Sequence, residues 1–232
     1  MLISFTRILL VFLIPVTIFS QENIVSTDSV TQKQKYGLRL GLDINKLVNS
    51  SINNSYDGFE LNADYRIGNK LYIASEIGLI ENTEDEEYIN FTTKGTYIKS
   101  GIDYNMYTNW IDMQNMIFAG FRIGYSNFEQ TINNYTIYDT NNQIWGQSFI
   151  NTPINNEDLS SLWVELIIGL KAEIFNNLFL GFNLEVKKMV NSEIKNNIQN
   201  MYVPGFNKTF EGSSFGVGFG YKLSYLIPIV KK

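Results

Sequence analysis

The 232-residue sequence contains no cysteine and no histidine. The lack of cysteine excludes disulfides, thiolate metal sites and thiol nucleophiles. The lack of histidine removes the side chain best suited to proton transfer near neutral pH, which is also the commonest metal ligand. We therefore expect a protein that is not an enzyme and that binds neither a cofactor nor a metal ion.

Excess charge and long hydrophobic runs are also scarce. The formal net charge of -5 is too small to indicate a nucleic-acid partner. Beyond the first 20 residues, no segment approaches the roughly 18 uninterrupted apolar residues of a transmembrane helix. Only 4 prolines stand against 14 tyrosines and 16 phenylalanines, a balance that favours β-structure.

Residues 1–20 have the organisation of a secretory signal peptide. Arg7 precedes an apolar run over residues 8–19, and the small Ser20 follows. The run contains Pro15 and is shorter than the roughly 20 residues that a membrane-spanning helix needs. Residues 21–35 are polar and aperiodic, which predicts a disordered periplasmic lead-in before the folded domain.

From Tyr36 onward, apolar residues occupy every second position in about eight separate segments. In one of them, Ile117, Phe121 and Ile123 share one parity, whereas Arg122 has the other. Strict alternation over roughly ten residues at a time is the signature of membrane-spanning barrel strands. The sequence therefore predicts that residues 36–232 form an all-β, eight-stranded antiparallel transmembrane β-barrel in the outer membrane of a bacterium.

Side-chain size indicates which face of the strands points inward. The apolar face carries far more large side chains than the interior of an eight-stranded barrel can hold, whereas the polar face is rich in glycine. The charged face is therefore predicted to line the lumen, where buried charges must be paired. An ion pathway is the alternative use of these charges, although an eight-stranded barrel has little room for one. The predicted lumen salt-bridge network comprises Arg39, Asp43, Glu60, Asp64, Arg66, Glu76, Lys99, Asp103, Arg122, Glu165, Lys171, Glu173, Glu185, Lys187 and Lys222.

The connections between the predicted strands alternate in length. Short turns are predicted at residues 68–69, 107–115 and 176–177, and long polar loops at residues 46–58, 81–93, 127–160 and 191–213. Outer-membrane barrels have short periplasmic turns and long extracellular loops. The same asymmetry is therefore expected here, with the four long loops outside the cell.

Two of the long loops carry aromatic residues in polar surroundings. Such residues suit either a recognition surface or a folded cap over the barrel mouth, and the sequence does not separate the two. On the recognition hypothesis, the predicted partner-binding residues are Tyr135, Tyr138, Trp145 and Phe149 in the loop 127–160, and Tyr202 and Phe206 in the loop 191–213.

Several strings in the sequence resemble an uncharacterised bacterial family, catalogued as domain of unknown function 6048. They are YGLRLGLD (36–43), NFTTKGTY (90–97), GIDYNMY (101–107), FNNLFLG (175–181) and YVPGFN (202–207). The resemblance implies an eight-stranded outer-membrane barrel without catalytic residues. It also implies an accessory subunit that acts beside other outer-membrane proteins or surface lipoproteins. Barrel-assembly machinery is one assembly of this kind. A surface adhesin or ligand-binding barrel remains the alternative.

Overall fold

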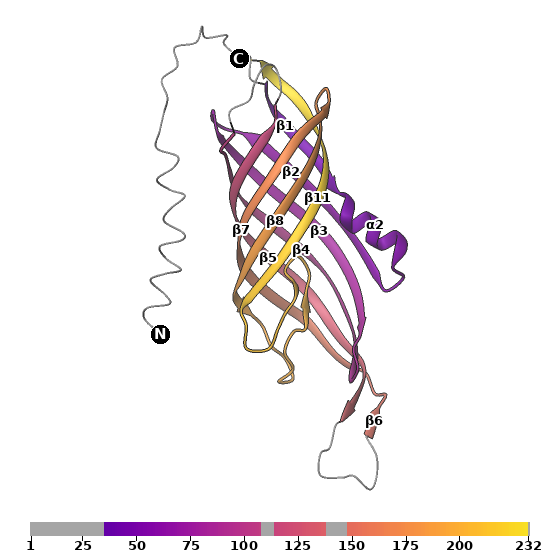
Figure 1. The fold of residues 1–232 in the computed structure, drawn as a ribbon. Coiled ribbons are helices and arrows are strands. Elements are labelled where there is room, and N and C mark those ends of the chain that lie inside the picture. Colours follow the sequence, from indigo (N-terminus) through magenta and orange to yellow (C-terminus); the bar gives the residue numbers. More distant parts are fainter. Residues whose placement is uncertain (1–34, 108–113, 138–147, 232) are drawn as a thin grey trace, which may run out of the picture. The chain divides into compact units, whose positions relative to one another are not determined.

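The computed structural model describes residues 35–107, 114–137 and 148–231. The long strands are β1 (Lys35–Asp43), β2 (Tyr56–Arg66), β3 (Leu71–Asp85), β4 (Ile89–Asn105), β5 (Met116–Ile137), β7 (Ile154–Phe175), β8 (Leu178–Ser192) and β11 (Phe215–Lys231). Each pairs antiparallel with the next one along the chain, and β11 pairs back onto β1, so the sheet closes on itself (Figure 1). This confirms the predicted eight-stranded antiparallel barrel. The predicted signal peptide lies outside the described residues.

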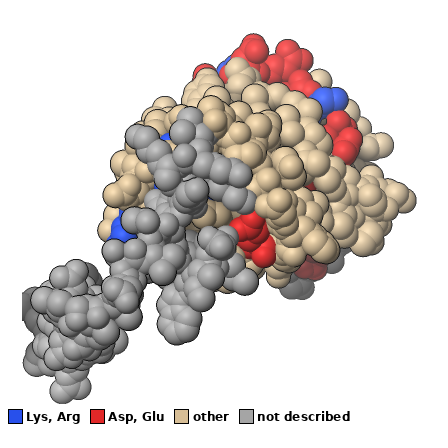
Figure 2. All heavy atoms as spheres, turned by 90° about the horizontal axis from the view of Figure 1, so that it is seen from above, with Lys and Arg blue, Asp and Glu red and all other residues tan. Residues whose placement is uncertain are grey.

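The large apolar side chains cover the outside of the barrel. On β7, Leu166 and Ile168 are each 64% exposed, whereas Glu165 and Ile167 on the opposite parity are buried. The view in Figure 2 shows a surface on which most side chains are uncharged. An apolar exterior of this extent is stable against lipid and not against water, so the chain is an outer-membrane β-barrel. Within the described ranges, no helix is both long enough and apolar enough to span a membrane.

We expect the protein to fractionate with outer membranes and to migrate differently on a denaturing gel before and after boiling. The reason is that a closed barrel has no free sheet edge from which unfolding can easily start. Recovery in the soluble periplasmic fraction would contradict the transmembrane assignment.

The strands extend further than the sequence pattern predicts. β5 and β7 have 22 residues each, about twice the roughly ten needed to cross a bilayer. The predicted loops 81–93 and 127–160 are therefore largely wrong, because β3, β4, β5 and β7 continue through them. The error arises because the outer face becomes polar there, as at Asn127 and Glu129, so the hydrophobic alternation ends while the strand does not.

This extension forms a sheet that projects beyond the apolar band. The projecting sheet is defined here as residues 81–85, 89–95, 127–137, 148–150 and 154–160. It includes β6 (Ser148–Ile150), a short strand that pairs with the end of β5. Figure 1 shows β6 at one end of the barrel. The start of β1 and the end of β11, which pair with each other, lie at the opposite end.

The predicted loop 46–58 also contains regular structure, the helix α2 (Ile44–Ile52). Asp43, the last residue of β1, caps the helix because its side chain accepts a hydrogen bond of 3.0 Å from the backbone N–H of Lys46. The sequence pattern missed α2 because nine residues hold too few turns for a helical period to be visible.

Candidate functional site

Several charged side chains in the lumen form a network around Lys99 of β4. The Lys99 Nζ lies 3.2 Å from a carboxylate oxygen of Glu76, 3.4 Å from one of Glu165 and 3.6 Å from one of Glu185. All four side chains are buried. Because the three carboxylates come from β3, β7 and β8, a single ammonium group connects strands across the barrel.

Two further lysines balance the acidic excess around Lys99. Lys187 lies 3.0 Å from Glu185, and Lys222 contacts both Glu76 and Glu60. Buried ion pairs of this kind remain stable only when each charge is compensated. The alternating signs therefore make the network self-neutralising.

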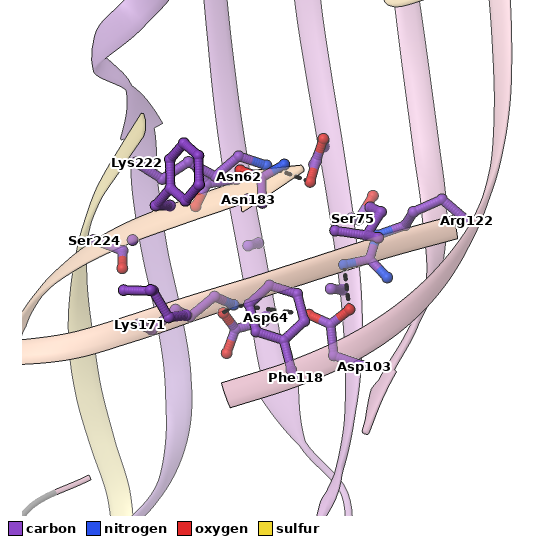
Figure 3. A pocket seen from close by; sticks show the side chains of 17 residues that line it. Asn62, Asp64, Ser75, Asp103, Phe118, Arg122, Lys171, Asn183, Lys222 and Ser224 are labelled. Carbon is purple, nitrogen blue, oxygen red and sulfur yellow. Dashed lines mark hydrogen bonds and ion pairs between the residues drawn. The ribbon is translucent and has the colours of Figure 1, made fainter. Parts of the chain in front are cut away.

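A second group of charges lies nearer the short turns of the barrel. Asp64 is 3.4 Å from Arg39 and 2.7 Å from Lys171, and Asp103 is 2.7 Å from Arg122. Lys171 also lies 3.7 Å from Asp103 and so links the two pairs. Figure 3 shows Lys171, Asp64, Asp103 and Arg122 converging from different strands.

At the other end, a lysine from α2 reaches into the network. The Lys46 Nζ lies 2.8 Å from Glu60 and 3.5 Å from Asp43. The hydroxyl of Tyr97 also donates a hydrogen bond to Glu60. The hydrophobic alternation does not reveal Lys46 as a lumen residue, because Lys46 lies in the predicted loop 46–58 and not on a predicted strand.

Two members of the predicted network hold the backbone of the short turns. The Arg66 guanidinium donates hydrogen bonds to the carbonyl oxygens of residues 68 and 69. Glu173 accepts hydrogen bonds from the backbone N–H groups of Gln114, at 3.0 Å, and Asn177, at 2.9 Å. Asn177 has a φ of 64°, a conformation that asparagine tolerates in tight turns.

The lumen has little free space between these charges. A cavity bordered by Asp64, Asp103, Arg122 and Lys171 has a volume of about 20 Å³, roughly the space for one water molecule (Figure 3). In the part of the chain that the structure describes, no three acidic side chains are grouped to hold a metal ion. The arrangement therefore supports a structural role for the network.

The barrel mouth is filled by a segment that we call the mouth plug, residues 201–209. It contains β9 (Tyr202–Val203) and β10 (Asn207–Lys208), which pair with each other. Val203 and Phe206 are buried, and the Phe206 ring lies edge-on to the ring of Trp163 at 6.1 Å. Gly205 has a φ of 82°, and a Cβ atom there would lie 2.7 Å from the Tyr97 ring, so only glycine fits.

Polar contacts fix the mouth plug to the surrounding strands. The Lys187 ammonium donates to the carbonyl oxygen of Gly205 at 2.8 Å, and the buried Gln130 side chain accepts from the backbone N–H of Met201 at 2.9 Å. Lys208 lies 2.5 Å from Glu86 in the β3–β4 turn, and this hydrogen bond raises the pKa of Lys208. Continued alternation past Phe128 on β5 was the signal that could have placed Gln130 inside the barrel.

The structure corrects the prediction for two of the proposed partner-binding aromatics. Tyr202 and Phe206 are buried in the mouth plug and are not available to a partner; burial also raises the pKa of Tyr202. Of the two interpretations that the sequence left undecided, the folded cap is therefore correct for the loop 191–213. Sequence alone could not show this, because an aromatic residue among polar neighbours can fold inward or outward with the same local pattern.

The remaining predicted aromatics have different surroundings. Phe149 on β6 is 63% exposed. Tyr135 on β5 is half-buried and packs against the apolar cluster around the mouth plug. Tyr138 and Trp145 lie outside the described residues.

The comparison with known families identifies the chain. The profile of the family described as "Domain of unknown function (DUF6048)" matches residues 1–232, the whole sequence. The chain belongs to this family. The family resemblance noted in the sequence is thereby confirmed, and the barrel described above is the fold of a DUF6048 protein.

Two solved structures have a related shape. One is Ail, the attachment invasion locus protein of Yersinia pestis, with 9% identity over 84% of this chain and 99% of that one, at a TM-score of 0.41. The other is Neisserial surface protein A, with 11% identity over 83% of this chain and 95% of that one, at a TM-score of 0.40. At these values the likeness supports no inference about function. No curated protein matches the sequence.

Proposed function

We propose that this DUF6048 barrel is a non-enzymatic accessory subunit that docks another outer-membrane protein or a surface lipoprotein, with barrel-assembly machinery as one such assembly. The observation that carries the proposal is the projecting sheet. β5 and β7 have about twice the length that a bilayer requires, and the additional residues form ordered sheet and not loose loop. A rigid platform of this kind suits the binding of a protein partner.

The interior of the barrel is an unsuitable place for function. The lumen charges neutralise one another, and the mouth plug fills the opening with Val203 and Phe206. The side chains that face the lipid are apolar, as in any outer-membrane barrel, and do not distinguish one partner from another. The projecting sheet is therefore the surface on which specificity for a partner can reside.

Two exposed aromatic residues lie on opposite sides of the end of β5, in β6 and in the turn before β4. Thr136 of β5 pairs with Phe149 of β6, and its backbone N–H donates to the carbonyl oxygen of Tyr88 at 2.8 Å. Phe149 is 63% exposed and Tyr88 is 41% exposed. Exposed aromatics on a rigid support are the residues that most often anchor protein interfaces, because they bury a large area at low entropic cost.

Affinity purification from gently solubilised membranes of the native host tests this proposal. The full-length protein is expected to recover a stoichiometric membrane partner. Replacing Phe149 with aspartate is expected to weaken that association by about 2 kcal/mol or more, the typical effect of removing an interface anchor. The Phe210→Asp variant is the matched control, because Phe210 is 58% exposed but lies beyond the mouth plug and off the projecting sheet.

The outcomes separate the two functional classes. Recovery of the barrel alone, together with binding to a soluble or host-surface ligand that Phe149→Asp abolishes, would favour the adhesin alternative. A partner that is retained equally by Phe149→Asp and by Phe210→Asp would contradict docking at this position.

A further inference from the structure

The helix α2 lies where the ring of strands is interrupted. β1 is the shortest of the eight long strands and ends at Asp43, which pairs with Lys222 of β11. Residues 56–60 of β2 and residues 215–221 of β11 extend past the last pairs that β1 forms. α2 follows Asp43 directly and packs against both of these strands. It therefore covers the part of the wall that β1 does not reach.

The polar face of α2 points toward the barrel. The Lys46 Nζ lies 2.8 Å from Glu60, whose side chain is buried in the lumen. One helical turn further along, the Ser50 hydroxyl oxygen accepts a hydrogen bond of 2.7 Å from the backbone N–H of Gly58 on β2. Because Lys46 and Ser50 are one turn apart, they lie on the same face of the helix. This face holds α2 to the lumen network and to β2.

The apolar face of α2 points away from the barrel. Val48 and Ile52 are also one turn apart, and their side chains are 47% and 78% exposed. Each follows a residue of the polar face by two positions, which turns it by roughly 200° around the helix axis. In a soluble protein, the apolar face of a helix packs against the core. In α2 this orientation is reversed, which is stable only where the surroundings of the helix are apolar.

The position of α2 along the barrel brings its apolar face to the depth of the lipid-facing strands. Val217 and Phe219, on the part of β11 that extends past β1, are 76% and 57% exposed. Phe59, which follows Gly58 on β2, also faces outward. Figure 1 shows α2 outside the ring of strands and beside β11, well short of the end of the barrel at which β6 lies. The apolar face of α2 is thus continuous with the lipid-facing surface of the barrel.

We propose that α2 is embedded in the bilayer, with Val48 and Ile52 in contact with the acyl chains of the leaflet nearer the projecting sheet. A helix suits this position because its backbone groups are hydrogen-bonded within the helix and need no water. The exposed Asn49 and Ser51 place α2 at the boundary between acyl chains and headgroups, where amphipathic helices lie, and not at the bilayer centre. This membrane contact goes beyond the proposed accessory function and does not depend on it.

Lipid fits this face better than a protein partner does. The patch consists of a few side chains on a helix of nine residues, whereas a stable protein interface buries about 800 Å² on each partner. The only charged residue of α2, Lys46, points toward the barrel, so the outward face carries no charge that could select a protein. The surface that surrounds the face is already in contact with acyl chains.

Fluorescence quenching by brominated lipids tests the proposal. The chain contains no cysteine, so an Ile52→Cys variant carries a single environment-sensitive fluorophore. The labelled barrel is refolded into dioleoylphosphatidylcholine vesicles, with or without bromine on the acyl chains. The reference variants are Ile77→Cys, at a lipid-facing position of β3 that is 54% exposed, and Glu129→Cys, at an exposed position of the projecting sheet. We expect the label at position 52 to be quenched as strongly as the label at position 77, and the label at position 129 to be unaffected.

A second labelled position and a second membrane complete the experiment. Heat-modifiable migration shows whether each variant has folded, and Val48→Cys on the same face replaces Ile52→Cys if that variant does not fold. In outer membranes of the native host, a photoreactive phenylalanine analogue at position 52 is expected to form adducts with lipid and none with protein.

Each of three results would overturn the proposal. A label at position 52 that behaves like the label at position 129 places α2 in water. A label whose emission indicates a dry environment but which brominated chains do not quench is covered by protein. An adduct in host membranes with a second copy of the chain or with another protein identifies a protein as the occupant. None of these results bears on docking at the projecting sheet, which the Phe149→Asp variant tests separately.

Discussion

Replacing Lys99 with methionine is expected to lower the free energy of unfolding by about 3–5 kcal/mol, the cost of removing one partner from a buried ion pair. Lys99 lies within 3.6 Å of the carboxylates of Glu76, Glu165 and Glu185, and all of these groups are buried. Methionine preserves the length of the side chain but leaves the three carboxylates with too little positive charge. Urea titration of the refolded barrel, followed by heat-modifiable migration, measures the effect.

The Lys94→Met variant is the matched control on the same strand. Lys94 lies 3.0 Å from Glu81, but its side chain is 61% exposed on the projecting sheet. Exposed ion pairs contribute about 0–1 kcal/mol, so a small change is expected. Equal unfolding midpoints for Lys99→Met and Lys94→Met would contradict the structural role of the lumen network.

The Phe206→Ala variant is expected to destabilise the folded mouth plug by about 3–5 kcal/mol, as found when large buried aromatic side chains are removed. Phe206 is 2% exposed and packs against Trp163, so truncation leaves a cavity in the centre of the barrel mouth. The Lys187 ammonium also depends on the plug, because it donates to the Gly205 carbonyl oxygen. Unfolding midpoints and protease sensitivity of residues 201–209 provide the measurement.

Phe210→Ala serves as the comparison for the mouth plug. Phe210 follows the plug directly but is 58% exposed, so its truncation removes little buried area. We expect a change within about 0.5 kcal/mol, as for most surface substitutions. If the Phe206→Ala variant is as stable and as protease-resistant as Phe210→Ala, the packing of Phe206 does not stabilise the mouth plug.

The transmembrane part of the fold could be predicted from the sequence because the information there is local. A strand that separates lipid from a packed lumen must alternate large apolar residues with small or charged ones. Whether a residue faces the lipid or the lumen therefore follows from its odd or even position in the strand. Ile123 and Arg122 are neighbours on β5, yet one is 52% exposed and the other is buried, as their parity predicts. The lumen positions of Lys99 and Glu165 follow from the same rule.

Above the bilayer this rule fails, and tertiary structure decides. The outer face of the projecting sheet becomes polar, as at Asn127 and Glu129, so the hydrophobic alternation stops although the strands continue. The mouth plug likewise depends on a fit between Gly205, Tyr97 and Trp163, which come from distant parts of the chain. No periodicity in the sequence records such a contact.

The sequence by itself therefore determined the barrel and its inward charges, whereas only the tertiary structure decided where the wall is interrupted. β1 ends at Asp43 because that residue caps α2, and Ser50 of this helix then accepts a hydrogen bond from the backbone of Gly58 on β2. Backbone hydrogen bonds between strands far apart in the chain depend on their register, and register is set by the closure of the whole barrel.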